Sequence, residues 1–163
     1  MKLSYQGIQD KQGYAAAQVA LPQYDWAKMA EKTAEKPVWV HFGAGNIFRG
    51  FIAGLQQRLL NAGLAESGIV AAETFDYDII DKIYVPHDSM TLMVSLKADG
   101  STQKEVIASI AKGIKANCAD EAQWQQLTDV FTAPSLQMAS FTITEKGYAL
   151  RNICLLYTSP SPR

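Results

Sequence analysis

The stretch "KPVWVHFGAGNIFRGFIAGLQQRLL", Lys36 to Leu60, carries the strongest fold signal in the sequence. It opens with "VWVHF" (38–42), a compact apolar run rich in β-branched and aromatic residues, which is typical of a strand buried on both faces. Gly43 and Gly45 interrupt the run, and apolar residues then recur at helical spacing as far as Leu60. The stretch therefore predicts a strand, a tight turn and a helix.

The glycines of this turn have the spacing that a dinucleotide site needs. One glycine allows the tight turn, a second lets the backbone approach the pyrophosphate, and the helix that follows offers free N–H groups and a positive dipole end. The third glycine of the general fingerprint is missing, because Phe48 stands at its position. Arg49 can either reach a phosphate oxygen or pair with a surface carboxylate. The alternative is a glycine turn that serves only close packing of strand and helix.

An acid follows at the place where a dinucleotide site needs one. Glu73 ends the next predicted strand, "SGIVAAE" (67–73), and Asp76 lies three residues further on. A carboxylate about 20 residues beyond the glycines can bond the ribose hydroxyls. It favours NAD over NADP, because it would repel a 2′-phosphate. The alternative is a solvated acid at the end of a strand.

The rest of the sequence continues the alternation of strands and helices. Helices are predicted over 24–36 (ended by Pro37) and 119–134, a short helix or irregular crossover over 75–85, and strands over 90–100 and 136–144. The run 104–114 fits either a strand or a helix. This order predicts an α/β fold of the Rossmann type, a parallel sheet with flanking helices, cut before the sheet is complete.

A polar segment, "SFTITEKGY" (140–148), ends the last predicted strand. In an open α/β sheet, ligands bind at the carboxyl ends of the strands. Thr144 and Glu145 are therefore expected to face the cofactor cleft. The alternative is a strand end closed by ordinary turn residues.

The overall composition restricts the function classes. The chain has 163 residues, 48% of them hydrophobic and 19% charged, with a net charge of −1. One globular domain is expected, with no electrostatic case for nucleic acid or an anionic membrane. The cysteines, Cys118 and Cys154, lack metal spacing, and neither His41 nor His87 has further ligands evident nearby, so no metal site is predicted. A cytoplasmic protein is the simplest expectation.

The chain divides into three predicted segments. Residues 1–36 form an N-terminal leader on the outside of the domain, and residues 37–152 form a partial NAD-binding domain. Residues 153–163 include "LLYTSPSPR", a Ser/Pro-rich end that resembles translated sequencing-adaptor sequence and is expected to be non-native. A genuine flexible tail is the alternative.

Three segments together resemble the mannitol dehydrogenase family of long-chain polyol and uronate dehydrogenases. They are "HFGAGNIFRGFIA" (41–53), "IYVPHDSMTLMVSLKADG" (83–100) and "PSLQMASFTITEKGY" (134–148). The resemblance implies an N-terminal Rossmann-type domain that binds NAD(H) and a mostly helical substrate domain carrying the catalytic lysine, asparagine and histidine. It also matches the cofactor turn without a third glycine, and places Glu145 near the active-site cleft.

The resemblance implies hydride transfer between NAD(H) and a sugar acid or polyol, of the D-mannonate/D-fructuronate or mannitol/fructose type. The substrate domain has no counterpart in these 163 residues, so we expect no turnover by this chain alone. The predicted cofactor contacts are Gly43, Ala44, Gly45, Asn46, Ile47, Phe48, Arg49, Glu73, Asp76, Thr144 and Glu145. Two alternatives remain, an S-adenosylmethionine-dependent methyltransferase and a non-catalytic nucleotide-binding module.

Overall fold

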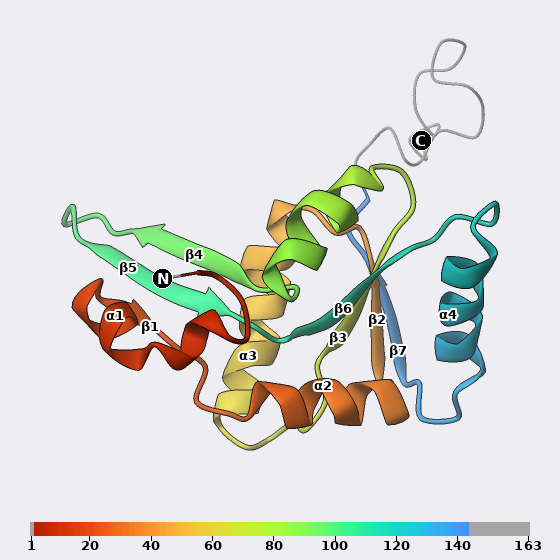
Figure 1. The fold of residues 1–163 in the computed structure, drawn as a ribbon, viewed down its shortest axis with the longest axis horizontal. Helices are drawn as coiled ribbons and strands as arrows, with labels where there is room; N and C mark the ends of the chain where they lie inside the picture. Colours follow the sequence, from red (N-terminus) through yellow and green to blue (C-terminus); the bar gives the residue numbers. More distant parts are fainter. Residues whose placement is uncertain (1, 144–163) are drawn as a thin grey trace, which may run out of the picture.

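The computed structural model describes residues 2–143, which form two sheets with helices around them (Figure 1). The larger sheet has four parallel strands in the order β6-β3-β2-β7. Their bounds are β2 Trp39–Phe42, β3 Ile69–Glu73, β6 Ile110–Lys115 and β7 Met138–Phe141. Along the chain, the strands are thus added to one side of β2 and then, after β6, to its other side. This is the order of a Rossmann-type sheet, as the sequence predicted.

Alternate residues of the central strands point to opposite faces of the sheet. Val40, Val70 and Ala72 pack with Leu127 and Val130 on one face. The other face forms a second core, in which Ala44, Phe48, Ala53, Ile69, Ala71, Ile80, Tyr84, Ile107 and Ile110 are buried. All five residues of β3 are buried, as expected for a strand covered on both sides.

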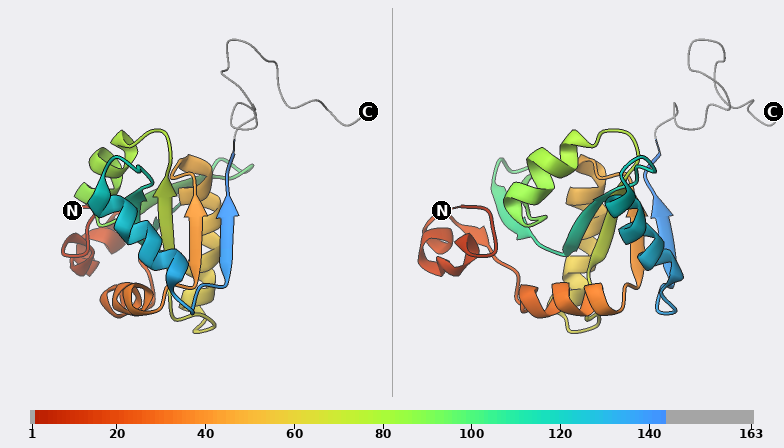
Figure 2. Two further views of the ribbon diagram at one scale, coloured as in Figure 1. Left: turned by 90° about the vertical axis from the view of Figure 1, so that its right-hand side faces the viewer. Right: turned by 45° about the vertical axis from the view of Figure 1, so that its right-hand side comes forward.

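Helices cover both faces of this sheet (Figure 2). On one face, the chain after β2 forms a π-helical turn, η2 (Phe48–Ile52), which continues into α3 (Ala53–Asn61). On the other face lies α4 (Glu121–Thr132), which begins where the Asp120 side chain accepts the N–H of Gln123. After α3, Gly63 adopts a φ of +68° and ends the helix.

The smaller sheet has the order β1-β5-β4 and extends away from the larger one. It contains β1 (Val19–Ala20), β4 (Thr91–Leu96) and β5 (Thr102–Ile107), with β4 and β5 forming an antiparallel hairpin. The ambiguous run 104–114 therefore contains the end of β5 and most of β6. Apolar runs this short carry no clear period, which is why the sequence did not separate strand from helix there.

The N-terminal segment packs against this smaller sheet. It contains η1 (Gly7–Gln9), α1 (Lys11–Ala16) and β1, followed by α2 (Trp26–Glu35). β1 pairs with β5 in parallel, and Ile8 and Tyr14 join Met90, Val106 and Ala108 in a third core cluster. Residues 1–36, expected as an outer leader, thus contribute a strand as well as helices.

The crossover after β3 is also helical. It contains the π-helical turn η3 (Ile80–Tyr84) and the 3₁₀ turn η4 (Val85–His87), in agreement with the short helix or irregular crossover predicted over 75–85. Gly113 of β6 lies directly beneath it, because a Cβ at Gly113 would stand 2.8 Å from Tyr84 and 2.9 Å from Ile80. Within residues 2–143, no helix has the length and apolar character to cross a membrane.

Candidate functional site

The glycine turn lies at the carboxyl end of β2, where the order of the sheet reverses. β2 is flanked by β3, which follows it in the chain, and by β7, which returns after β6. Ligands of open α/β sheets bind at this switch point. The structure therefore places the turn predicted from the sequence at the edge where the fold offers a binding site.

Gly43 is the one residue of the turn with a left-handed backbone, at a φ of +103°. Its N–H donates to Ala72 O of β3 at 2.9 Å. A Cβ at this position would stand 2.5 Å from Thr142 Oγ1 and 2.8 Å from Thr142 O. Both the backbone angle and the close approach of Thr142 therefore require glycine here.

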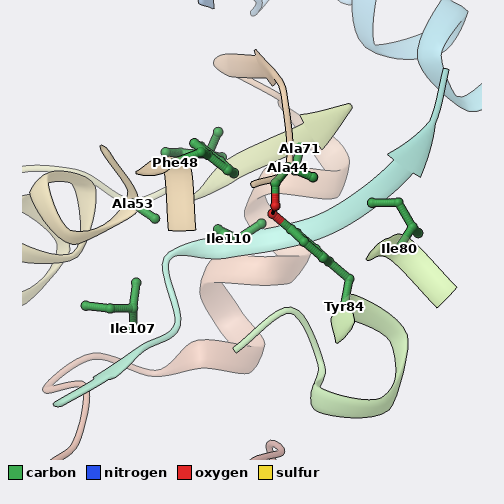
Figure 3. Packing of buried hydrophobic residues seen from close by; sticks show 9 residues of the cluster. Ala44, Phe48, Ala53, Ala71, Ile80, Tyr84, Ile107 and Ile110 are labelled. Atoms are coloured by element: carbon green, nitrogen blue, oxygen red, sulfur yellow. Dashed lines mark hydrogen bonds between the residues drawn. The ribbon is translucent and has the colours of Figure 1, made fainter. Parts of the chain in front are cut away.

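Ala44 is buried and held by two side chains from other elements. Its N–H donates to Glu73 Oε2 at 2.8 Å, and its carbonyl oxygen accepts the Tyr84 hydroxyl at 3.1 Å. Figure 3 shows Tyr84 reaching from the crossover to Ala44. Burial raises the pKa of the Tyr84 phenol, which keeps the hydroxyl protonated as a donor.

The second half of the turn opens outward. A Cβ at Gly45 would meet no atom within 4 Å among the described residues, and Asn46 and Ile47 are exposed. Arg49 N–H donates to Gly45 O at 3.0 Å, so the helix begins here, and the first N–H groups of a helix have no partner within it. Among the described residues, the resulting surface combines open space, amides without a partner in their own helix and the positive end of a helix dipole.

Arg49 adds a positive charge beside this opening. Its Nη2 donates to Asn46 Oδ1, one turn earlier in the helix. Its Nε is buried and has no hydrogen-bond partner among the described residues. A buried guanidinium donor without an acceptor, next to a helix N-terminus, fits an anionic ligand such as a phosphate.

Phe48, which replaces the third glycine of the fingerprint, fills the space between helix and strand. Its ring is buried and stacks on His41 of β2, with centroids 4.1 Å apart and planes at 6°. The third glycine normally permits close packing of helix on strand. Here a stacked aromatic pair forms that contact instead, within the wider π-helical turn η2.

Glu73 is buried, and its carboxylate is engaged by backbone amides. Besides the bond from Ala44, Oε1 accepts the N–H groups of Thr74, Phe75 and Asp76 at 3.0, 3.0 and 3.3 Å. Asp76 is exposed on the same loop. The structure thus brings Glu73 to the turn, where it joins the two loops, and leaves Asp76 as the accessible carboxylate; contacts of either acid with a ribose stay a prediction.

An apolar groove of about 490 Å³ lies beside this loop, on the α4 face of the sheet. Phe42, Thr74 and Ala116 line it from the ends of three strands, and Trp124 and Phe131 line it from α4. Thr144 and Glu145, predicted to face the cofactor cleft, lie outside the described residues. Among residues 2–143, no group of three or more His, Cys, Asp or Glu side chains is arranged to hold a metal ion.

Four residues at the turn were not predicted as site residues: His41, Tyr84, Ser140 and Thr142. Tyr84 and Thr142 donate to carbonyl oxygens of the turn. His41 stacks on Phe48, and Ser140 contacts His41. The polar residues at alternate positions of "SFT" (140–142) were the available signal, since alternate residues of a strand share one face.

The chain is similar to known oxidoreductases. No family model matches the chain. It is 41% identical to D-mannonate oxidoreductase of Thermotoga maritima over 152 residues, which cover 93% of this chain and 28% of that protein. It is 28% identical to altronate oxidoreductase of Halalkalibacterium halodurans over 120 residues, covering 71% of this chain and 23% of that protein.

Two solved structures share the fold. Mannitol 2-dehydrogenase of Pseudomonas fluorescens, in a ternary complex with NAD and D-mannitol, matches with a TM-score of 0.70 and 26% identity. This match covers 91% of the present chain and 28% of the other. A substrate-free D-sorbitol dehydrogenase matches with a TM-score of 0.65 and 27% identity, over 85% of this chain and 27% of the other.

The fold, the turn and these matches define a Rossmann-type unit of the kind found in dehydrogenases. The matches confirm the resemblance of the chain to the mannitol dehydrogenase family of long-chain polyol and uronate dehydrogenases. The chain spans about a quarter of the length of the curated relatives that it matches.

Proposed function

We propose that this chain is the NAD-binding part of a dehydrogenase that transfers hydride between NAD(H) and a sugar acid or polyol. The observation that carries the proposal is the open half of the glycine turn. Gly45 faces free space at a helix N-terminus, beside a buried Arg49 Nε that has no acceptor among the described residues. A pyrophosphate supplies the negative charge and the oxygens that these groups lack.

The residues around the turn can share the parts of a dinucleotide. Backbone amides at the start of the helix and Arg49 would hold the pyrophosphate. Asp76 or Glu73 would bond a ribose, and the apolar groove beside Thr74 would take an aromatic base. When bound, NAD accepts or supplies the hydride, while these residues bind and orient it.

The proposed substrate class follows from the relatives. The D-mannonate and altronate oxidoreductases carry the names of sugar acids, and the two structural neighbours carry the names of polyols. We favour a sugar acid of the D-mannonate type, because the chain is 41% identical to the D-mannonate oxidoreductase and 28% identical to the altronate oxidoreductase. The family resemblance assigns the catalytic lysine to a separate, mostly helical substrate domain.

Calorimetric titration of the 163-residue chain tests the proposal. NADH is expected to bind saturably and more tightly than NADPH, because carboxylates near the ribose disfavour a 2′-phosphate. S-adenosylmethionine serves as the competing ligand for a methyltransferase, and D-mannonate with NAD should give no turnover. Saturable binding of S-adenosylmethionine without binding of NADH would overturn the proposal.

A further inference from the structure

A chain of polar side chains runs through the sheet and ends on the glycine turn. Trp39 and His41 lie on one face of β2, and Ser140 and Thr142 lie beside them on and just after β7. Trp39 Nε1 lies 2.6 Å from Ser140 Oγ, which lies 2.8 Å from His41 Nδ1. His41 Nε2 lies 3.1 Å from Thr142 Oγ1, which lies 3.3 Å from Gly43 O.

The groups at its two ends determine which atom donates and which accepts at every step of this hydrogen-bond chain. The indole of Trp39 only donates, so Ser140 Oγ accepts at that contact. The carbonyl of Gly43 only accepts, so the Thr142 hydroxyl gives its single hydrogen to it. Thr142 must then accept from His41, which places the imidazole proton on Nε2. The free lone pair on Nδ1 accepts the Ser140 hydroxyl, so each polar side chain of this hydrogen-bond chain has a partner.

The surroundings of His41 keep the imidazole in the neutral form that this arrangement requires. Its ring is fully buried, stacked on Phe48 and flanked by two hydroxyls. Burial lowers its pKa to about 4. A charged imidazolium would carry protons on both nitrogens and could no longer accept from Ser140.

The hydrogen-bond chain ends on one particular peptide group of the turn. The carbonyl oxygen of Gly43 and the N–H of Ala44 belong to the same peptide unit. Thr142 Oγ1 donates to the first, and Glu73 Oε2 accepts from the second at 2.8 Å. Both ends of this peptide are therefore held by side chains, and its orientation determines where the backbone beyond it, at Gly45, faces.

We infer that Ser140, His41 and Thr142 are positioning residues, forming a one-way hydrogen-bond chain that fixes the orientation of the Gly43–Ala44 peptide. The assignment of a ligand to that peptide rests on the proposed function; the hydrogen-bond chain itself does not. None of the three side chains needs to touch the dinucleotide. They act through the peptide whose orientation sets the opening at Gly45.

Nitrogen NMR of the histidine side chains tests the inference in the complete 163-residue chain without any ligand. We expect His41 as the neutral tautomer protonated at Nε2. Thr142→Val should change the tautomer ratio of His41 and shift the amide signals of Ala44 and Gly45, whereas Thr142→Ser should restore both. Thr102→Val, an exposed substitution on β5, is the matched control and should change neither.

The outcomes separate this inference from the proposed function. A His41 protonated at Nδ1, or Ala44 and Gly45 signals in Thr142→Val that match those of Thr102→Val, would overturn the inference. If Thr142→Val does not fold, Ser140→Ala breaks the same hydrogen-bond chain one step earlier and is judged by the same signals.

With NADH, Thr142→Val should weaken binding roughly fivefold, the value of one hydrogen bond, and Thr142→Ser should not. Failure of the unsubstituted chain to bind NADH, with the expected tautomer present, would overturn the proposed function and leave the inference standing.

Discussion

Glu73 Oε2 accepts the N–H of Ala44 at 2.8 Å, although the two residues are 29 positions apart in the sequence. The contact joins the loop after β3 to the turn after β2. Three further amides of its own loop donate to the same carboxylate. Glu73 therefore stabilises the shape of the site whether or not it also touches a ribose.

Replacing this carboxylate should destabilise the fold. In Glu73→Ala, the buried N–H of Ala44 would lose its acceptor, and each buried donor left without a partner costs about 1–3 kcal/mol. Urea unfolding followed by circular dichroism should show a lower midpoint. The control is Glu66→Ala, which removes an exposed partner of Lys32 and should shift the midpoint little. Equal midpoints for the two variants would contradict the role given to Glu73.

Substitution by alanine should destabilise the protein at Gly43 but not at Gly45. Gly43→Ala places a Cβ 2.5 Å from Thr142 Oγ1 at a φ of +103°, and should cost about 1–3 kcal/mol of unfolding free energy. Gly45→Ala meets no atom within 4 Å and should leave the thermal unfolding temperature nearly unchanged. A large loss of stability in Gly45→Ala would show that this side of the turn is packed rather than open.

Arg49 should contribute to dinucleotide affinity. Arg49→Met removes the charge and the buried Nε donor, and should weaken NADH binding about tenfold, as expected for a hydrogen bond to a charged group. Arg58→Met, at an exposed position of α3, is the matched control. Calorimetric affinities that fall equally in the two variants would point to a general charge effect rather than a phosphate contact.

His41 should make stability depend on pH. Its folded-state pKa of about 4 lies below the value of about 6.5 for an unfolded histidine, so below pH 6.5 the unfolded state binds the extra proton. The stabilisation is complete above about pH 6.5 and is lost as the pH falls toward 4, by an amount on the order of 3 kcal/mol.

The measurement for His41 is a comparison of unfolding free energies between pH 7 and pH 4.5. Carboxylates also titrate in this range, so the same series is recorded for His41→Gln, which cannot titrate at this position. The difference between the two series is the contribution of His41. Parallel series would mean that His41 keeps an ordinary pKa in the folded protein.

The sequence predicted the features that local patterns determine. The apolar run before Gly43, the helical spacing after it and the all-apolar core of β3 each identify an element without knowledge of its neighbours. The order of these elements then predicts the parallel sheet. The run 104–114 could not be assigned, because two short strands meet there within one apolar stretch.

The contacts that shape the turn could not be predicted in the same way. Tyr84 and Thr142 reach Gly43 and Ala44 only after the crossover and β7 have taken their places. The outward face of η2 and α3 is a further example, since Phe51, Leu55 and Leu59 have helical spacing but are 65%, 42% and 43% exposed. Spacing indicates a helix, but it does not show which apolar side chains other elements cover.

The most direct test of NAD binding at the glycine turn is calorimetric titration of NADH into the unsubstituted chain and into Gly45→Ala. We expect saturable binding to the unsubstituted chain. We expect binding at least about tenfold weaker in Gly45→Ala at an unchanged unfolding temperature, because the new Cβ occupies the space that the pyrophosphate needs. No saturable binding to the unsubstituted chain, or equal affinity in the two proteins, would contradict NAD binding at the glycine turn.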